Sequence, residues 1–212
     1  MFRTTCVSLF AAALLAAPMV AQSAAPPPPS KDPKAASSGT YNLDPRHTGV
    51  VARVPHAGGF SHSVFRFDKA SGSLAWDSAA PANSKLTFVV DPKSITSNVA
   101  GFSDELSGDK FLNAGKFPEA KFVSTSAKIT GAGKGTVTGD FTLMGVTKPV
   151  TFEVELVGAG LEAAGGGKPV DTVGFSAKGK IKRSDFGFTA LVGPIGDEVD
   201  LTIDTEFHKA AA

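Results

Sequence analysis

The chain has 212 residues, with 21 lysine and arginine residues against 20 aspartate and glutamate residues, and a single cysteine. The balanced charge and the lack of a basic run argue against nucleic acid or an anionic membrane surface as the partner. Because Cys6 lies in an apolar N-terminal segment, the rest of the chain has no disulfide, thiol nucleophile or thiolate metal site.

Residues 1–23 have the pattern of a secretory signal peptide. Arg3 precedes an apolar run, and the small-x-small tripeptide 21–23 follows it. The run is too short and too rich in alanine for a membrane span, so we expect no stable membrane insertion. A secreted chain without cysteine in its mature part favours the bacterial periplasm as its compartment.

The sequence then divides into a tether and one domain. Residues 24–39, "AAPPPPSKDPKAASSG", are rich in proline, alanine and serine and predict an extended, largely disordered tether. We expect a single domain over residues 40–208, and residues 209–212 to form a C-terminal tail.

Apolar and polar residues alternate in short runs along this domain, as they do in strands with one buried face. The runs lie at residues 50–54, 65–67, 85–91, 136–145, 150–158, 173–183 and 199–207. Glycine-rich stretches such as "KASGS", "GAGKG", "MGVTKP" and "AAGGGK" separate them and predict turns. This pattern indicates an all-β, antiparallel sandwich or barrel.

Residues 94–120 are the exception, because they lose the period of two. Ser103 predicts the N-cap of a short helix over residues 104–113, with Asp104 and Glu105 in its first turn. The segment also carries Phe102, Leu106 and Phe111. We expect it to form a lid over one mouth of the sheet structure.

Few residues suggest catalysis or metal binding. The histidines His47, His56, His62 and His208 have no ligand spacing, so we expect no metal site. The sequence has no nucleophile elbow and no recognisable triad, and "GAGKG" is better explained as a hairpin turn than as a phosphate loop. The chain is therefore not expected to be an enzyme.

Arg183 is more informative, because its strand parity matches that of Ile181 and turns it to the apolar side. A buried arginine needs a partner, and the main expectation is a salt bridge to an aspartate. The aspartates considered are Asp104, Asp185 and Asp197. The alternative is that Arg183 anchors a ligand head group at a cavity mouth, with His56 as a second candidate for that role.

Phenylalanine is the dominant aromatic residue, with 16 copies against one tryptophan and one tyrosine. Phenylalanine supplies apolar area without a polar group that needs a hydrogen bond. Most of these rings must fill a core, but an eight-stranded barrel is also just wide enough to hold one small ligand.

Five stretches resemble the YceI family of bacterial secreted, lipocalin-like proteins, and they occur in that family's order. They are "YNLDPRHTGVVARVPH", "DELSGDKFLNAGKFPEAKF", "VTGDFTLMGVTKPVTFEVELVG", "GFSAKGKIKRSDFGF" and "GDEVDLTIDTEF". The resemblance implies an eight-stranded antiparallel β-barrel with a long apolar tunnel, to which the short helical lid expected from residues 94–120 would be added. It also implies a polyisoprenoid lipid or quinone as the ligand, with no other cofactor.

On this resemblance and on strand parity, we predict the residues that line the tunnel. They are Ala52, Val54, Phe65, Phe88, Phe141, Phe152, Val154, Phe175 and Ile203 in the wall and Phe102, Leu106 and Phe111 in the lid. The predicted function is that of a periplasmic carrier for a long-chain isoprenoid lipid. Two alternatives stay open: an enzyme acting on a lipid in the same cavity, and a structural or interaction barrel without a ligand. The sequence also leaves open whether the chain forms a homodimer.

Overall fold

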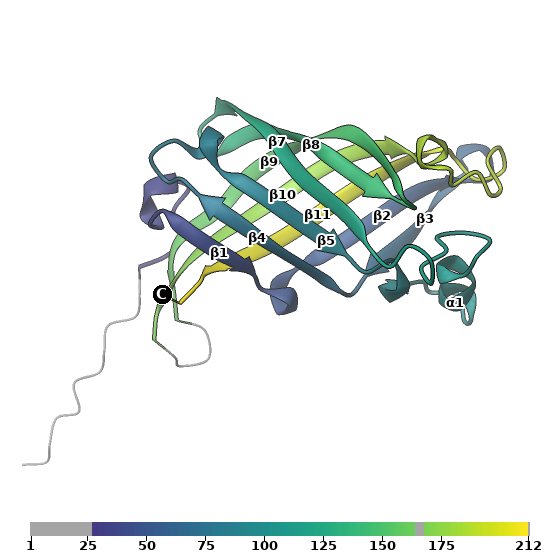
Figure 1. Cartoon of the computed structure of the whole chain (residues 1–212), viewed down its shortest axis with the longest axis horizontal. Coiled ribbons are helices and arrows are strands. Elements are labelled where there is room, and N and C mark those ends of the chain that lie inside the picture. The colour runs from purple at the N-terminus through teal and green to yellow at the C-terminus, as the bar shows by residue number, and fades with distance from the viewer. Residues whose placement is uncertain (1–26, 164–167, 212) are drawn as a thin grey trace, which may run out of the picture.

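The computed structural model describes residues 27–163 and 168–211, which form an elongated antiparallel β-barrel (Figure 1). All its strands belong to one sheet, in the order β1-β4-β5-β7-β8-β9-β10-β11-β2-β3-β6, and pairing of β1 with β11 closes the barrel. The strands are β1 Gly39–Leu43, β2 Gly49–His56, β3 Ser61–Phe67, β4 Ala70–Trp76, β5 Lys85–Val90, β6 Ile95–Thr96, β7 Ala120–Gly131, β8 Lys134–Leu143, β9 Val146–Glu162, β10 Val170–Lys182 and β11 Glu198–Lys209.

These segments combine into eight barrel strands, because three of the strands are interrupted. Both β1 and β2 pair with β11. On their other side, β1 pairs with β4 and β2 pairs with β3. In the same way, β4 pairs with β5 and β3 pairs with β6. Thus β1 with β2, β3 with β4 and β5 with β6 are halves of single strands. The prediction of an eight-stranded antiparallel barrel is confirmed.

Two Asp-Pro pairs explain two of the three interruptions, the one between β1 and β2 and the one between β5 and β6. The Asp44 side chain accepts from the N–H of Arg46, and the Asp91 side chain accepts from the N–H of Lys93, each at the start of a 3-10 turn. Proline lacks a backbone N–H and fixes φ, so it suits the first position of such a turn and ends the strand ladder. The 3-10 helices span Pro33–Ala35, Pro45–His47, Ala57–Gly59, Pro81–Asn83, Pro92–Ser94 and Arg183–Phe186.

The strands β7 to β11 run without such breaks and form consecutive hairpins. The turn between β7 and β8 is the "GAGKG" stretch, where Gly133 has a φ of 64° that favours glycine, so its interpretation as a hairpin turn is confirmed. Side chains alternate between core and solvent along these strands, and the core lies inside the barrel.

The helical segment is shorter than expected. Helix α1 spans Phe102–Ser107 and follows Gly101, which has a left-handed φ of 76°. Ser103 therefore lies inside the helix, and its hydroxyl accepts from the backbone N–H of Ser97 instead of capping it. The extended backbone of Gly108 ends the helix, so the prediction of residues 104–113 was wrong at both ends. The helix contacts β6 and lies at the right-hand end of the barrel in Figure 1, below the labels of β2 and β3.

The segment expected to be a disordered tether is docked on the opposite end of the barrel. The backbones of Ser30 and Ala159 in β9 exchange two hydrogen bonds of 2.9 and 2.7 Å. Asp32 caps the following 3-10 turn, and Ala36 is fully buried. The expectation was wrong for residues 30–38, because the segment satisfies its polar groups and buries apolar ones against the barrel.

The domain boundaries predicted from the sequence lie close to those in the structure. Lys209, placed in the predicted tail, ends β11, and the N–H of Ala210 donates to the carbonyl of Thr40. The predicted signal peptide lies outside the described residues. No helix in the described part of the chain is long and apolar enough to cross a membrane.

Candidate functional site

The barrel encloses a cavity of about 850 Å³ that extends from one end to the other. Its lining includes Gly131 and Gly133 of the β7–β8 turn at one end and Leu191 and Ile195 of the β10–β11 loop at the other. Ligand sites typically have volumes of about 300–1,000 Å³ and mostly apolar walls. The cavity is therefore a tunnel of a size that fits a long, narrow, apolar molecule.

Every residue predicted to face the tunnel lines it in the structure. These are Ala52, Val54, Phe65, Phe88, Phe102, Leu106, Phe111, Phe141, Phe152, Val154, Phe175 and Ile203, together with the head-group candidates Arg183 and His56. Leu106 and Phe111 are buried, so the helical segment contributes to the wall at its end of the barrel. Their roles in binding stay predictions.

Two large rings lie against the wall rather than across the tunnel. If Gly139 carried a Cβ atom, that atom would collide with the ring of Phe122. A Cβ atom on Gly179 would likewise lie only 2.6 Å from Phe152 Cδ1. The two rings contact each other edge to face at 5.3 Å. Each glycine thus leaves room for a ring from the neighbouring strand, which keeps the tunnel open between bulky residues.

Arg183 is 3 % exposed, but its partners are not those expected. Nε donates to the carbonyl of Gly196 at 2.8 Å, and Nη2 donates to that of Ile195 at 3.0 Å. Nη1 donates to the carbonyls of Ala190 at 2.6 Å and Phe188 at 3.3 Å. Arg183 therefore holds the β10–β11 loop over the end of the barrel.

The predicted salt bridge of Arg183 was wrong, since no carboxylate among the described residues pairs with it. The Asp197 carboxylate instead accepts from the backbone N–H and hydroxyl of Ser184. Burial lowers the pKa of the Arg183 guanidinium, and the charge of Asp197 opposes that shift. An arginine remains protonated in proteins, so the wall carries a buried positive charge.

His56 lies at the mouth beside this loop. Its side chain is exposed, it forms a β-bridge with Ile195, and the next residue, Ala57, donates its N–H to the carbonyl of Pro194. Among the described residues His56 has no ion pair with a carboxylate. The arrangement offers no acid–base pair at this position.

Trp76 lines the tunnel near the end opposite to Arg183, and its Nε1 is buried without a hydrogen-bond partner. The indole contacts Phe175 edge to face at 5.8 Å. A buried donor without a partner costs about 1–3 kcal/mol.

Replacing Trp76 by phenylalanine is therefore expected to change the free energy of unfolding by less than about 1 kcal/mol, because the lost apolar area is offset by removal of the unpaired donor. Urea unfolding followed by circular dichroism measures this. A loss of about 3 kcal/mol or more, as for other large-to-small core changes, would contradict the expected offset between the two effects.

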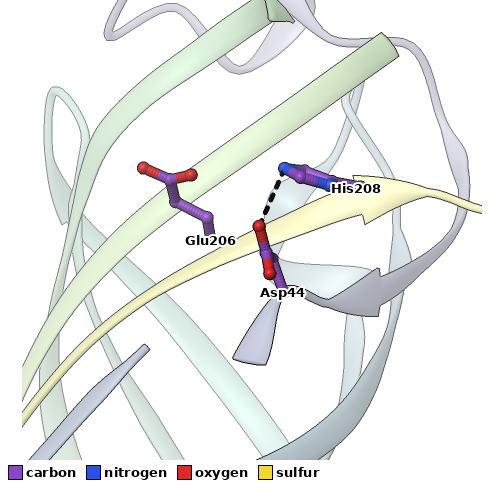
Figure 2. Close-up of side chains that lie close together, drawn as sticks. All are labelled: Asp44, Glu206 and His208. Carbon is purple, nitrogen blue, oxygen red and sulfur yellow. Dashed lines mark ion pairs between the residues drawn. The ribbon is translucent and has the colours of Figure 1, made fainter. Parts of the chain in front are cut away.

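A second cluster of polar groups lies outside the tunnel, where the β1–β2 interruption meets β11. Figure 2 shows Asp44, Glu206 and His208, whose potential ligand atoms all lie within 4.8 Å of one another. His47 Nδ1 lies 2.8 Å from Asp44 Oδ2, and His208 Nε2 lies 2.9 Å from Glu162 Oε2. These hydrogen bonds occupy carboxylate and imidazole lone pairs that a metal ion would need. We therefore interpret the cluster as a set of hydrogen bonds that links β9, β11 and the β1–β2 connection.

The cluster sets the charge of its members. Burial alone would raise the pKa of Asp44, but hydrogen bonds from the backbone and side chain of Arg46 and from His47 hold it well below its usual range. The hydrogen bond to Asp44 and the charge of Glu206 raise the pKa of His47. Sequence reasoning missed this cluster because its residues come from distant strands and only the β1–β11 pairing brings them together.

A comparison with known protein families identifies the family of this chain. The model of the YceI-like domain matches residues 41–207, which is nearly the whole barrel. The chain belongs to the YceI-like domain family. A UPF0312 protein of Yersinia enterocolitica is 38% identical over 178 residues, covering 83% of this YceI-like chain and 90% of that protein.

Solved structures share the barrel of this YceI-like chain. The YceI protein of Campylobacter jejuni has a TM-score of 0.59 at 28% identity, covering 69% of this chain and 85% of that one. A domain from Saccharophagus degradans described as polyisoprenoid-binding has a TM-score of 0.58 at 14% identity, covering 80% of this chain and 98% of that one. At that identity the second likeness shows the fold alone.

Proposed function

We propose that this YceI-like chain is a periplasmic binding and carrier protein for a long-chain isoprenoid-type lipid, such as a quinone or a prenyl compound. The observation that carries the proposal is the tunnel of about 850 Å³ with its almost wholly apolar lining. Membership of the YceI-like family and the polyisoprenoid-binding structural neighbour support the choice of ligand class.

Burial of the lipid tail supplies the driving force. Removing apolar surface from water stabilises the complex by about 25 cal/mol per Å², before the costs of association. A long tail therefore binds tightly with few polar contacts. The wall of aliphatic and phenylalanine side chains contains few groups that such a tail would leave without a hydrogen-bond partner.

Exposed apolar side chains surround the mouth at the helix α1 end. Phe60 is 95 % exposed on the β2–β3 turn, and Val99 and Leu191, which also line the tunnel, are more than half exposed. Apolar side chains gathered in this way mark interaction surfaces. This mouth is where the lipid enters and leaves in the proposed carrier.

The two alternatives receive less support. An enzyme needs an activated nucleophile or an acid–base pair in the cavity. The described lining residues include serines and His56 but no cysteine, and no aspartate or glutamate that could form such a pair with them. An interaction barrel without a ligand would be filled by its own side chains, whereas a tunnel of this volume remains.

Native mass spectrometry of the protein purified from its own periplasm, followed by solvent extraction, tests the proposal. The expected result is a lipid that co-purifies in stoichiometric amount and stays bound to the protein in the gas phase. An empty protein that also fails to take up a long-chain quinone or a prenyl alcohol in vitro would contradict the carrier function and favour the interaction barrel.

A further inference from the structure

The segment before β1 crosses the end of the barrel that holds the β7–β8 turn. The backbones of Ser30 and of Ala159 in β9 exchange two hydrogen bonds, and the Ser38 hydroxyl accepts from the backbone N–H of Ser78, just after β4, at 2.9 Å. In the closed sheet, β4 and β9 have three strands between them on either side, β5, β7 and β8 or β1, β11 and β10. The two anchors therefore lie on opposite sides of the barrel, and the chain between them passes over its end.

Part of this segment forms the end wall of the tunnel. Pro33, in the 3-10 helix Pro33–Ala35, lines the tunnel together with the glycines of the β7–β8 turn. A Cβ on Gly133 in that turn would lie 3.7 Å from the Cβ of Lys31, so the segment packs against the turn. Ala36 is fully buried. The segment thus covers the mouth of the tunnel instead of following its rim.

Polar contacts of side chains fasten the segment to three strands. Lys31 Nζ lies 2.5 Å from Glu155 Oε1 in β9, and the Ser37 hydroxyl donates to the Asp171 carboxylate in β10. Lys209 Nζ, in β11, donates to Ser37 Oγ at 2.5 Å. All three contacts are exposed, and exposed pairs contribute little to stability. The segment can therefore be displaced without breaking the hydrogen-bond ladders of the barrel.

We propose that residues 29–38 are a plug, the N-terminal plug, which closes this end of the tunnel and sets the longest lipid tail that the tunnel holds. The inference rests on the proposed function and adds to it a determinant of tail length. Affinity for an apolar tail grows with the area that the protein removes from water. With one end closed, tail units beyond the length of the tunnel stay in water at the α1 end and add nothing.

Gly158 in β9 offers a change that displaces the N-terminal plug from the barrel side. A Cβ on Gly158 would lie 2.8 Å from the Cβ of Pro29, and among the described residues only Pro29 has atoms within 4 Å of it. Gly158→Val is therefore expected to displace the plug while the barrel stays folded, because valine suits a strand. Gly49→Val is the matched control, since a Cβ on this strand glycine has no contact within 4 Å. Urea unfolding checks that both variants are folded.

Iodide quenching of Trp76 fluorescence tests the plug without any ligand. Trp76 is the one tryptophan in the chain, lines the tunnel and lies opposite Gly39, the first residue of β1. Iodide is charged and does not cross an apolar tunnel, so it reaches the indole only when the plug is displaced. The Stern–Volmer constant is expected to be higher for Gly158→Val than for the wild type and Gly49→Val. Equal constants in the three proteins contradict a closed end.

A mixture of prenyl alcohols tests the limit on tail length. Native mass spectrometry of the protein incubated with equimolar farnesol, geranylgeraniol and solanesol gives the relative occupancy by each tail. The ratio of bound solanesol to bound geranylgeraniol is expected to be at least about tenfold higher in Gly158→Val than in the wild type, as for burial of about two further CH₂ groups. An equal ratio in both overturns the inference but leaves the carrier function standing. If the wild type binds none of the three alcohols, the carrier function itself is contradicted, and the iodide measurement still tests the plug.

Pro33→Phe tests the same limit in the opposite direction. The larger side chain extends the plug into the tunnel, so the ratio of bound geranylgeraniol to bound farnesol is expected to fall by about tenfold or more. Lys34→Phe is the control, because Lys34 is exposed and does not line the tunnel. Wild-type ratios in both Gly158→Val and Pro33→Phe would overturn the assignment of the limit to the N-terminal plug.

Discussion

Replacing Gly179 by valine is expected to weaken binding of a long-chain lipid by about tenfold or more while the barrel stays folded. The new Cβ would lie 2.6 Å from Phe152 Cδ1, so the phenyl ring must leave the wall and turn into the tunnel. The atoms that must move belong to a side chain that can rotate, and valine suits a strand better than glycine does. Calorimetric titration with a lipid of the co-purifying class, alongside urea unfolding, measures both effects.

Two glycines supply the controls for this change. A Cβ on Gly174, in the same strand, has no contact closer than 3.8 Å, so Gly174→Ala is expected to alter neither binding nor folding. A Cβ on Gly139 would instead collide with the backbone carbonyl of Val123 as well as with the Phe122 ring, so Gly139→Ala is expected to destabilise the barrel. If Gly179→Val binds lipid as well as the wild type does, the ring of Phe152 does not border the path of the tail.

The wall of the tunnel could be predicted from the sequence because strand geometry is strictly periodic. Once a run such as residues 150–158 is recognised as a strand, the parity of Phe152 and Val154 determines which face they share. The resemblance to the YceI family then indicated that this face encloses a ligand. Neither step depends on contacts between distant parts of the chain.

The partners of Arg183 could not be predicted in this way. Its hydrogen bonds go to carbonyl groups, which every residue has, so the loop sequence carries no side-chain signal for them. The same limit applies to the segment before β1. A composition rich in proline and serine predicts an extended chain, but whether that chain docks depends on the surface of β9 that it meets.

Replacing Asp44 by asparagine is expected to lower the free energy of unfolding by about 1–3 kcal/mol at pH 7. The carboxylate side chain is 4% exposed and accepts from Arg46 and His47, so the neutral amide loses charge-assisted bonds and places an NH₂ group among donors. Urea unfolding measures the loss. Glu198→Gln is the matched control, because that carboxylate is 54% exposed in its pair with Lys180 and exposed pairs contribute little.

The pH dependence of stability provides a sharper test of the Asp44 cluster. The folded state holds the pKa of Asp44 below its unfolded value of about 4, so its contribution is complete above that pH and is lost as the pH falls. His47 acts in the opposite direction: its raised pKa stabilises the protein fully below about pH 6.5 and this effect disappears as the pH rises through the folded value. Asp44→Asn should therefore flatten the acid limb of the wild-type profile and weaken its dependence around neutral pH. Profiles that run parallel at all pH values would show that neither the ionisation of Asp44 nor its hydrogen bond to His47 contributes to the pH dependence of stability.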